Sequence, residues 1–311
     1  MKRRWILAWL LGSSLTAFAD AGRPQVLVAL PAVYALTSVL SDGTAIEVVR
    51  VPQDAAVPME SQAHTLSRLA PDVFQQATAV VTLSSLWRAD PLYATARRHN
   101  LRIVEIDASH AWDSIKPGVA AIRAPANDVP WAAVHEAEGD LSPYAWLGPV
   151  NAMRMSAIIA ADLARLSPGD ASRIERNLGG LEGRLRALKA EYGARLVHVT
   201  DLRVLSLASE FIYLFDEFGI YVDGWFIRQD IDWSDADRAA LTQYLREREI
   251  RVVVHKWAPD ARIVQAIEDA GAQLLILDTG NPGVLADPAN GYYALMVANL
   301  NALLAAFPVR Q

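Results

Sequence analysis

The chain of 311 residues contains no cysteine. This absence excludes disulfide bonds, thiolate metal sites and thiol catalysis, and it also excludes a lipid anchor on an N-terminal cysteine. The patterns G-x-S-x-G, G-x-G-x-x-G and H-E-x-x-H are missing, as is a phosphate-binding P-loop. Six histidines are scattered without the spacing of a metal site. Together these absences disfavour an enzyme.

Positive charge is scarce as well. The sequence has 29 Lys and Arg against 35 Asp and Glu, a formal net charge of -6. Because no basic cluster follows the N-terminal residues, we do not expect a nucleic-acid partner. With 52% hydrophobic and 21% charged residues the composition is that of a globular protein. The length favours two domains or one body with two lobes.

An uncharged apolar stretch lies near the N-terminus. Three basic residues at positions 2–4 precede an apolar run at 5–11, and two small-residue cleavage patterns end at Ala19 and Ala21. The run is too short to cross a bilayer comfortably. This order predicts a signal peptide over residues 1–21, cleaved after Ala19 or Ala21. We therefore expect a periplasmic protein, exported through the inner membrane, that is not a lipoprotein.

Short β-rich runs alternate with helical patterns in both halves of the chain. The predicted strands are 25–30, 46–52, 79–84 and 102–107, then 195–200, 219–227, 251–257 and 273–279. Helices are predicted at 91–100, 234–248 and 261–270. The alternation predicts an α/β fold of two lobes, each a mostly parallel sheet flanked by helices.

One long helix is predicted between the two halves. Ser167 has the chemistry of an N-cap, Pro168 suits the first helical position, and apolar residues then recur every three or four positions. We expect this helix, residues 167–192, to join an N-terminal lobe (22–166) to a C-terminal lobe (193–311).

Ligands of parallel sheets bind outside the carboxyl ends of the strands. Two facing lobes would therefore enclose a cleft lined by the loops that follow the strands. The residues predicted at these ends include Trp87, Thr200-Asp201, Lys256-Trp257 and Asp278-Thr279.

Several segments together resemble the zinc- and manganese-type ABC solute-binding proteins. Residues 142–152, SPYAWLGPVNA, are similar to the family segment D-P-H-x-W-L-D-P-x-N-A, and 210–220 to H-D-A-F-x-Y-x-x-x-Y-G-L. Leu277-Asp278 is similar to the L-D-P turn, and 291–300 to the closing Y-x-x-x-M-x-x-N-L helix. The resemblance implies a periplasmic binding protein, not an enzyme, that delivers its ligand to an ABC permease in the inner membrane.

The departures from the family concern the ligand. Family members hold a metal with three histidines and a carboxylate. Here Asp278 stands at the carboxylate position and His64 falls near the first histidine, but Tyr144 replaces the second and the third falls at Ala208, two residues before Glu210. The acidic, histidine-rich loop of many zinc members is missing too. Because a tight zinc site needs about four ligands, we do not expect ordinary zinc capture.

The leading hypothesis is capture of a metal chelate such as a ferric siderophore, as in the ferripyoverdine branch that the pattern resembles. The chelator supplies the coordination shell of the metal, so protein histidines become unnecessary. No resident cofactor is expected, and a second periplasmic binding protein is a further candidate partner. The expected ligand-binding residues are His64, Trp87, Tyr144, Glu210, Arg228, Lys256, Trp257 and Asp278.

Two alternatives remain open. His64, Tyr144 and Asp278 form an oxygen-rich set that would suit a bare Mn or Fe ion better than Zn. Alternatively, the protein is a periplasmic accessory or interaction protein of an uptake system and binds no ligand. In that case no ligand would raise its thermal stability, although anything that binds only the folded state must do so.

Overall fold

The structure, a computed structural model, describes residues 23–307 except 55, 114, 116, 133–139 and 283–287. The predicted signal peptide lies outside the described residues. Within them, no helix has both the length and the apolar composition that crossing a membrane requires.

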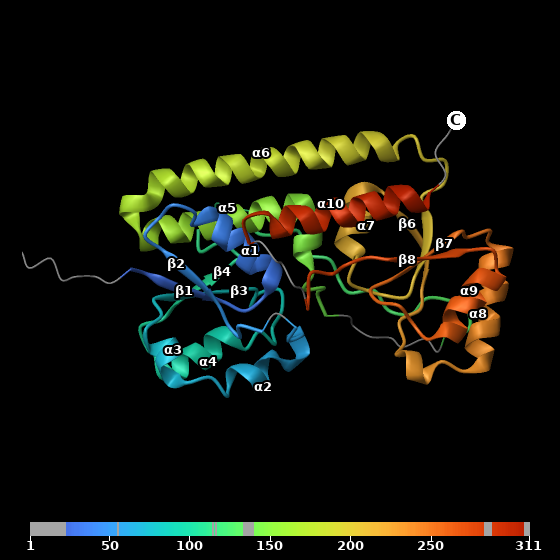
Figure 1. Ribbon diagram of the computed structural model, residues 1–311, viewed down its shortest axis with the longest axis horizontal. Coiled ribbons are helices and arrows are strands. Elements are labelled where there is room, and N and C mark those ends of the chain that lie inside the picture. Colours follow the sequence, from blue (N-terminus) through green and yellow to red (C-terminus); the bar gives the residue numbers. More distant parts are fainter. Residues whose placement is uncertain are drawn as a thin grey trace, which may run out of the picture.

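Two parallel sheets of four strands form the two lobes (Figure 1). The first has the order β2-β1-β3-β4 and the second the order β6-β5-β7-β8, and every neighbouring pair is parallel. The predicted α/β fold of two parallel sheets flanked by helices is confirmed. The strands are β1 (Gln25–Val28), β2 (Glu47–Arg50), β3 (Ala79–Thr82), β4 (Val104–Asp107), β5 (Arg203–Ser206), β6 (Tyr221–Trp225), β7 (Val252–His255) and β8 (Gln273–Ile276).

One predicted strand is wrong. Residues 195–200 do not form a strand, because the helix α6 (Ala171–Leu196) continues to Leu196 and a turn follows. Leu196 is buried and continues the apolar stripe of that helix, so the helical period outweighs local β-propensity. The strand β5 begins at Arg203 instead. Thr200-Asp201 therefore precedes a strand, and the segment after β5 leads to Glu210.

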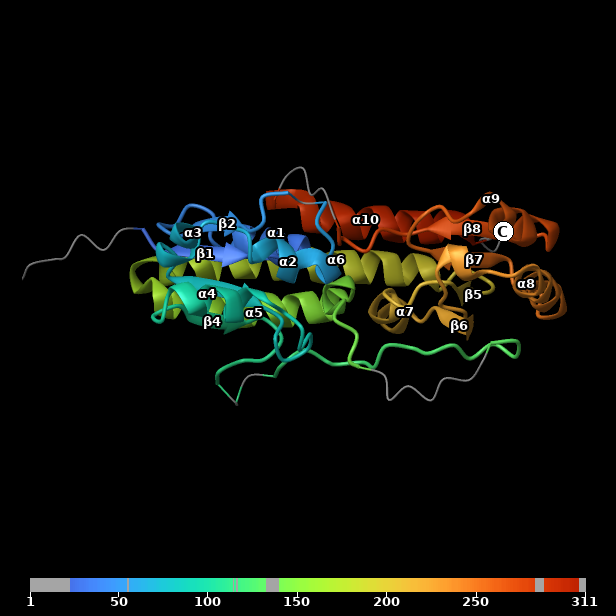
Figure 2. The same cartoon turned by 90° about the horizontal axis from the view of Figure 1, so that it is seen from below.

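The long helix α6 runs along both lobes (Figures 1 and 2). A short 3-10 turn, Pro168–Asp170, precedes it. Ser167 does not cap the helix with its side chain; its hydroxyl donates to Asp170 Oδ2 at 2.7 Å, and the same oxygen accepts from Ala45 N at 3.0 Å. The start of the helix is thereby tied to the loop before β2.

A second helix also bridges the lobes. α10 (Pro288–Ala306) packs against α1 (Pro31–Leu40), α6 and β8. One continuous core contains residues of both sheets, among them Val28 and Val254. The division into 22–166, 167–192 and 193–311 remains a proposal, and the shared core indicates that the lobes do not fold independently.

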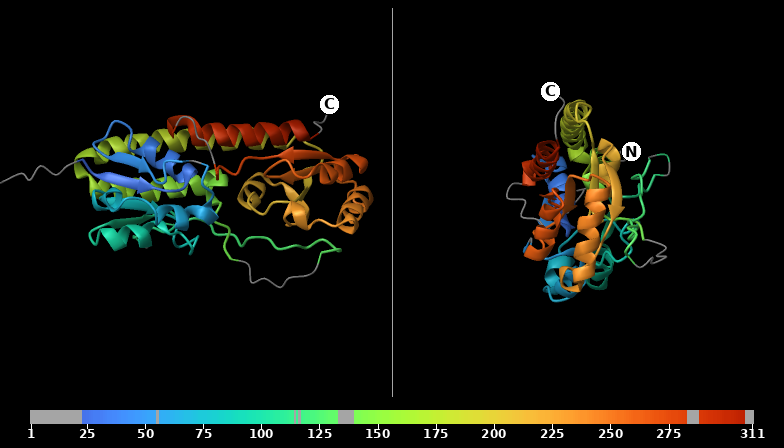
Figure 3. Two further views of the ribbon diagram at one scale, coloured as in Figure 1. Left: turned by 60° about the horizontal axis from the view of Figure 1, so that its bottom comes forward. Right: turned by 90° about the vertical axis from the view of Figure 1, so that its right-hand side faces the viewer.

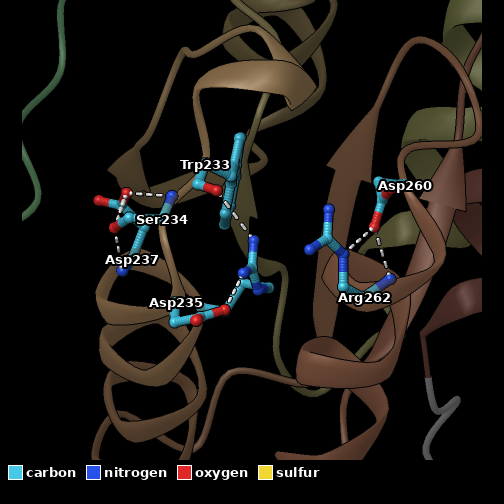
Figure 4. A network of polar contacts seen from close by, with 7 residues as sticks. Trp233, Ser234, Asp235, Asp237, Asp260 and Arg262 are labelled. Atoms are coloured by element: carbon cyan, nitrogen blue, oxygen red, sulfur yellow. Dashed lines mark hydrogen bonds and ion pairs between the residues drawn. The ribbon is translucent and has the colours of Figure 1, made fainter.

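The remaining helices cover the faces of the sheets. They are α2 (Gln62–Leu66), α3 (Pro71–Gln75), α4 (Leu92–His99), α5 (Pro149–Leu166), α7 (Ile212–Phe218), α8 (Asp235–Glu247) and α9 (Ala261–Asp269). Two of them begin at side-chain caps (Figure 4). Ser234 Oγ accepts from Asp237 N at 3.1 Å while Asp237 Oδ2 accepts from Ser234 N at 2.8 Å, a capping box. Asp260 Oδ1 accepts from Arg262 N at 2.9 Å.

A segment of the first lobe crosses to the second. The strap, defined as residues 119–132, leaves β4 and runs along the edge of the second sheet (Figures 2 and 3). Asp128 N donates to Trp225 O at 3.1 Å and Asp128 Oδ1 accepts from Trp225 N at 2.5 Å. Val129 is buried in the core of the second lobe, against the face of Gly224, where a Cβ would lie 2.7 Å from the valine.

Candidate functional site

The segment of residues 142–148 lies against the loop that follows β8. Trp146 is fully buried; its Nε1 donates to Thr279 O at 2.8 Å and its carbonyl accepts from the Tyr292 hydroxyl at 2.6 Å. The Tyr213 hydroxyl donates to Ser142 O at 2.9 Å. These bonds fix the segment to the second lobe and place Tyr144 near the carboxyl ends of its strands.

Tyr144 is 9% exposed and packs against Trp146, with ring centroids 5.1 Å apart. The side chain of Asn281 hydrogen-bonds the phenol. Burial, and after it the negative charges of Glu210 and Glu60, raise the pKa of the Tyr144 phenol well above its usual value. Tyr144 is therefore a neutral phenol at physiological pH, bordered by two carboxylates.

Glu210 and Lys256 form an ion pair beside this phenol. Glu210 follows β5 and Lys256 follows β7, and the Lys256 ammonium contacts Glu210 Oε1. Glu210 is 6% exposed, and its other oxygen, Oε2, is buried without a hydrogen-bond partner. The ammonium also lies 4.5 Å from the centroid of the Trp257 ring, a cation-π contact.

The loop after β8 presents Asn281 rather than Asp278 to Tyr144. Asp278 is exposed, and its Oδ1 accepts from Gly280 N at 2.7 Å. Gly280 has a φ of +70°, and a Cβ there would lie 2.8 Å from Leu295. Asn281 is buried, and its Oδ1 has no partner. We call Tyr144, Glu210, Lys256 and Asn281 the junction site.

The residue before Lys256, His255, is buried and hydrogen-bonds the backbone of Lys256. His255 Nδ1 accepts from Lys256 N at 2.8 Å, which leaves the ring proton on Nε2, 3.9 Å from Asp230 Oδ1. Burial lowers the pKa of His255 by more than the nearby Asp230 carboxylate raises it. The imidazole is therefore neutral near pH 7. Trp257, 39% exposed, packs on its ring at 4.9 Å and points its Nε1 to Asp230 Oδ1 at 3.5 Å.

Three residues proposed from the sequence lie apart from this group. His64 is exposed on α2, with Nε2 3.4 Å from Arg68 Nη1. Arg228 pairs with Asp237 at 2.8 Å in the capping box of α8. Trp87 lines a cavity of about 530 Å³ in the first lobe. Among the described residues, no hydrogen bond, ion pair or ring contact joins His64, Trp87 or Arg228 to the junction site.

Glu60 and Asn281, which both act on Tyr144, were not predicted from the sequence, and neither was the buried Gln62 of α2. Gln62 is 1% exposed, and neither its amide nitrogen nor its oxygen has a partner. Asparagine and glutamine match no metal motif, so the one usable signal was position: Asn281 follows Asp278 by three residues in the same loop. Across the part of the chain that the structure describes, no group of three or more His, Cys, Asp or Glu side chains could hold a metal ion.

Comparisons with known proteins place the chain in a family. The model of ZnuA, described as the periplasmic component A of a zinc-uptake complex, matches residues 56–306. No curated protein matches the chain. FpvC from Pseudomonas aeruginosa in complex with Mn²⁺ is similar in structure, with a TM-score of 0.69 and 21% identity over 91% of this chain and 98% of that chain.

Two further solved structures show the same fold. Zn(II)-bound AdcA from Streptococcus pneumoniae has a TM-score of 0.69 and 17% identity, covering 93% of this chain and 60% of that chain. A crystal structure of ZnuA has a TM-score of 0.66 and 17% identity over 90% of this chain and 98% of that chain. Since the family match spans most of the sequence, the chain belongs to the ZnuA family, the metal-type periplasmic solute-binding proteins of ABC importers, which are not enzymes.

Proposed function

We propose that this protein captures a metal chelate of the ferric siderophore type at the junction site and delivers it to an ABC permease. The observation that carries the proposal is the ion pair between Lys256 and Glu210 beside Tyr144. Tyr144 and Glu210 stand in the regions that resemble the second and third metal-binding loops of the family, and Lys256, which follows β7, pairs with Glu210. A phenol and a carboxylate paired with a cation therefore occupy a place where a metal-binding member offers histidines.

The junction site offers few ligands to a bare metal ion. Protein ligands must lose their protons to bind a metal, and burial, which raises the pKa of the Tyr144 phenol, makes that loss more costly. Lys256 already occupies one oxygen of Glu210, and among the described residues no group of three or more His, Cys, Asp or Glu side chains could hold a metal ion. A chelate brings its own donor atoms. It needs hydrogen bonds, ion pairs and an aromatic surface, which Glu210, Lys256 and Trp257 offer.

Of the other residues proposed to contact the ligand, some are available for binding and others are already paired. Asp278 belongs to the loop of Asn281, and Trp87 lines its own cavity, so both suit outer contacts of a large ligand. Arg228 would have to leave Asp237, and His64 would have to leave Arg68. Export with removal of residues 1–21, and cooperation with a second periplasmic binding protein, belong to the same proposal.

A titration of the metal-stripped protein tests the proposal. Mn²⁺, Zn²⁺, ferric citrate, ferric trihydroxamates and ferric catecholates are added while tryptophan fluorescence and the melting temperature are recorded. We expect one ferric chelate to give saturable quenching and a higher melting temperature, with no response to bare ions. Tight one-to-one binding of a bare ion, without any response to chelates, would overturn the proposal.

A matched pair of variants locates the site. Lys256→Met removes the cation of the junction site, whereas Arg186→Met removes an exposed cation of α6 that pairs with Glu182. We expect chelate affinity to fall about tenfold or more in Lys256→Met, the loss of one charged contact of roughly 1.5 kcal/mol. Arg186→Met should bind as the unaltered protein does.

A bare-ion site is the second candidate. The structures of FpvC with Mn²⁺ and with Ni²⁺ favour it, as does the unpartnered Oε2 of Glu210. Under this hypothesis Tyr144→Phe abolishes ion binding, and retained affinity would count against it. If no ion and no chelate changes the melting temperature, the third possibility, an accessory protein without a ligand, takes precedence.

A further inference from the structure

Two hydrogen-bond acceptors at the junction site are buried and unused. Glu210 Oε2 and Asn281 Oδ1 have no partner, and both residues are 6% exposed. Both side chains act on the same phenol, Asn281 through a hydrogen bond and Glu210 through its charge. A buried polar atom without a hydrogen-bond partner costs free energy, because it has lost its water and gained nothing in return. A ligand that supplies donors to both atoms recovers this energy.

The local charge is also unbalanced. The carboxylates of Glu60 and Glu210 both act on Tyr144, and Lys256 is engaged with Glu210 Oε1. His255, behind Lys256, has a lowered pKa and adds no charge near pH 7, and Asp230 on its far side is a further carboxylate. The groups around the phenol therefore carry an excess of negative charge.

We propose that the ligand presents a protonated amine or a guanidinium to Glu210 Oε2 and Asn281 Oδ1, so that the protein selects chelators with a cationic group. Such a group has several N–H donors and no acceptor, which matches two acceptors beside an excess of carboxylates. A carboxylate on the chelator would instead repel Glu210. This inference rests on the proposed capture of a chelate and specifies its chemistry.

Three ferric trihydroxamates that share the same metal-binding core and differ only at the terminal amine test the inference. Ferrioxamine B carries a terminal ammonium, its N-acetyl derivative carries a neutral amide, and its N-succinyl derivative carries a carboxylate. Dissociation constants are measured by tryptophan fluorescence and calorimetry with the full-length mature protein. We expect the ammonium form to bind at least tenfold more tightly than the acetyl form, and the succinyl form to bind most weakly.

Two substitutions test whether the preference for the ammonium form depends on Glu210. In Glu210→Gln the difference between the ammonium and acetyl forms should disappear, whereas Glu47→Gln, an exposed carboxylate of β2, should retain it. If Glu210→Gln fails to fold, as circular dichroism would show, Glu60→Gln serves instead. It leaves the Lys256 pair intact and should reduce the preference several-fold.

Equal affinities, or tighter binding of the succinyl form, would overturn the inference. So would the absence of binding by all three complexes. That last result does not decide the proposed function, which then depends on ferric citrate and ferric catecholates. The two ideas therefore fail in distinguishable ways.

Discussion

The two lobes have equivalent strand orders but use the acidic residues near their strand ends differently. In the first lobe, the carboxylate of Asp107 accepts from the backbone nitrogens of Ser85 and Ser109, each at 2.9 Å, and Asp90 accepts from Leu83 N at 2.9 Å. In the second lobe, Glu210 gives one oxygen to Lys256 and leaves the other unpartnered. The first lobe uses these carboxylates to hold its own loops, whereas the second has one buried carboxylate oxygen that is free for the proposed ligand.

The edges of the two sheets differ as well. β2 and β6 occupy the same place in their sheets. Within the described residues, the backbone of β2 is hydrogen-bonded to β1 and to no third segment, while β6 also bonds the strap at Trp225. The lobe that carries Glu210, Lys256 and Asn281 is thus the one whose edge is covered by the strap of the first lobe.

The largest expected effect comes from breaking the strap. Val129→Asp places a charge in the core of the second lobe, which should cost about 3 kcal/mol of unfolding free energy or more. Urea denaturation measures the loss. Val197→Asp is the matched control, because Val197 is 76% exposed and its substitution should change stability by less than about 0.5 kcal/mol. Equal effects of the two substitutions would show that the strap does not pack as described.

The next effect concerns the loops of the first lobe. Asp107→Asn replaces one carboxylate oxygen by an NH₂ group that faces donors, including Ser109 Oγ at 2.6 Å. The unfolding free energy should fall by about 2 kcal/mol. Chelate affinity of the folded protein should stay unchanged, and a selective loss of affinity would instead place Asp107 in the ligand site.

The stability of the protein should depend on pH in opposite directions through Asp90 in the first lobe and Asp237 in the second. Burial, with help from Glu105 and Asp107, raises the pKa of Asp90 to about 6. Its contribution to stability is complete below its unfolded pKa and is lost as the pH rises through about 6. Between pH 7.5 and pH 5 the protein should therefore gain about 1 kcal/mol, measured against Asp90→Asn, which should lack this gain.

Asp237 in the second lobe should behave oppositely. Burial tends to raise its pKa, but hydrogen bonds from Ser234 and the charge of Arg228 outweigh it and lower the pKa overall. The stabilisation is present above the unfolded value of 3.8 and is lost as the pH falls through the folded pKa. Asp237→Asn should therefore reduce stability at pH 7 and have less effect at a pH below the folded pKa of Asp237. An unchanged effect at both pH values would contradict this assignment.

The smallest effect on stability is expected at the junction site. Glu210→Gln removes a buried negative charge that Lys256 compensates only in part. The Lys256 ammonium that remains is partly exposed, so water can solvate it. We expect the unfolding free energy of the ligand-free protein to change by less than about 1 kcal/mol. Thermal and urea denaturation measure it. A loss as large as that of Asp107→Asn would mean that Glu210 has a structural role, and the contrast between the lobes would fail.

The repeating part of the fold was predictable from the sequence, and the parts set by tertiary packing were not. Period-two and period-3.6 patterns located seven of the eight strands and the long helix, because those patterns reflect burial directly. At 195–200 a buried helical end carries the same residue types as a strand. The strap has no periodic pattern, and its position depends on Gly224, about 95 residues away, leaving room for Val129.

The candidate site was partly predictable for the same reason. Glu210 opens a segment that resembles the family, and Lys256 lies near the end of a predicted strand. The two meet because β5 and β7, which precede them, are neighbours in the second sheet. Asn281 was not predictable, because its direction depends on the turn at Gly280 against Leu295. Arg228 was expected at the ligand, but nothing in its local sequence showed that Asp237 would bind it.

Native mass spectrometry of the loaded protein tests the central claim most directly. The mature protein is incubated with ferric chelates and with free Mn²⁺ and Zn²⁺, desalted, and weighed intact. The account predicts one added mass equal to metal plus chelator, which is lost in Lys256→Met. An added mass equal to a bare metal ion, unchanged in that variant, would contradict it.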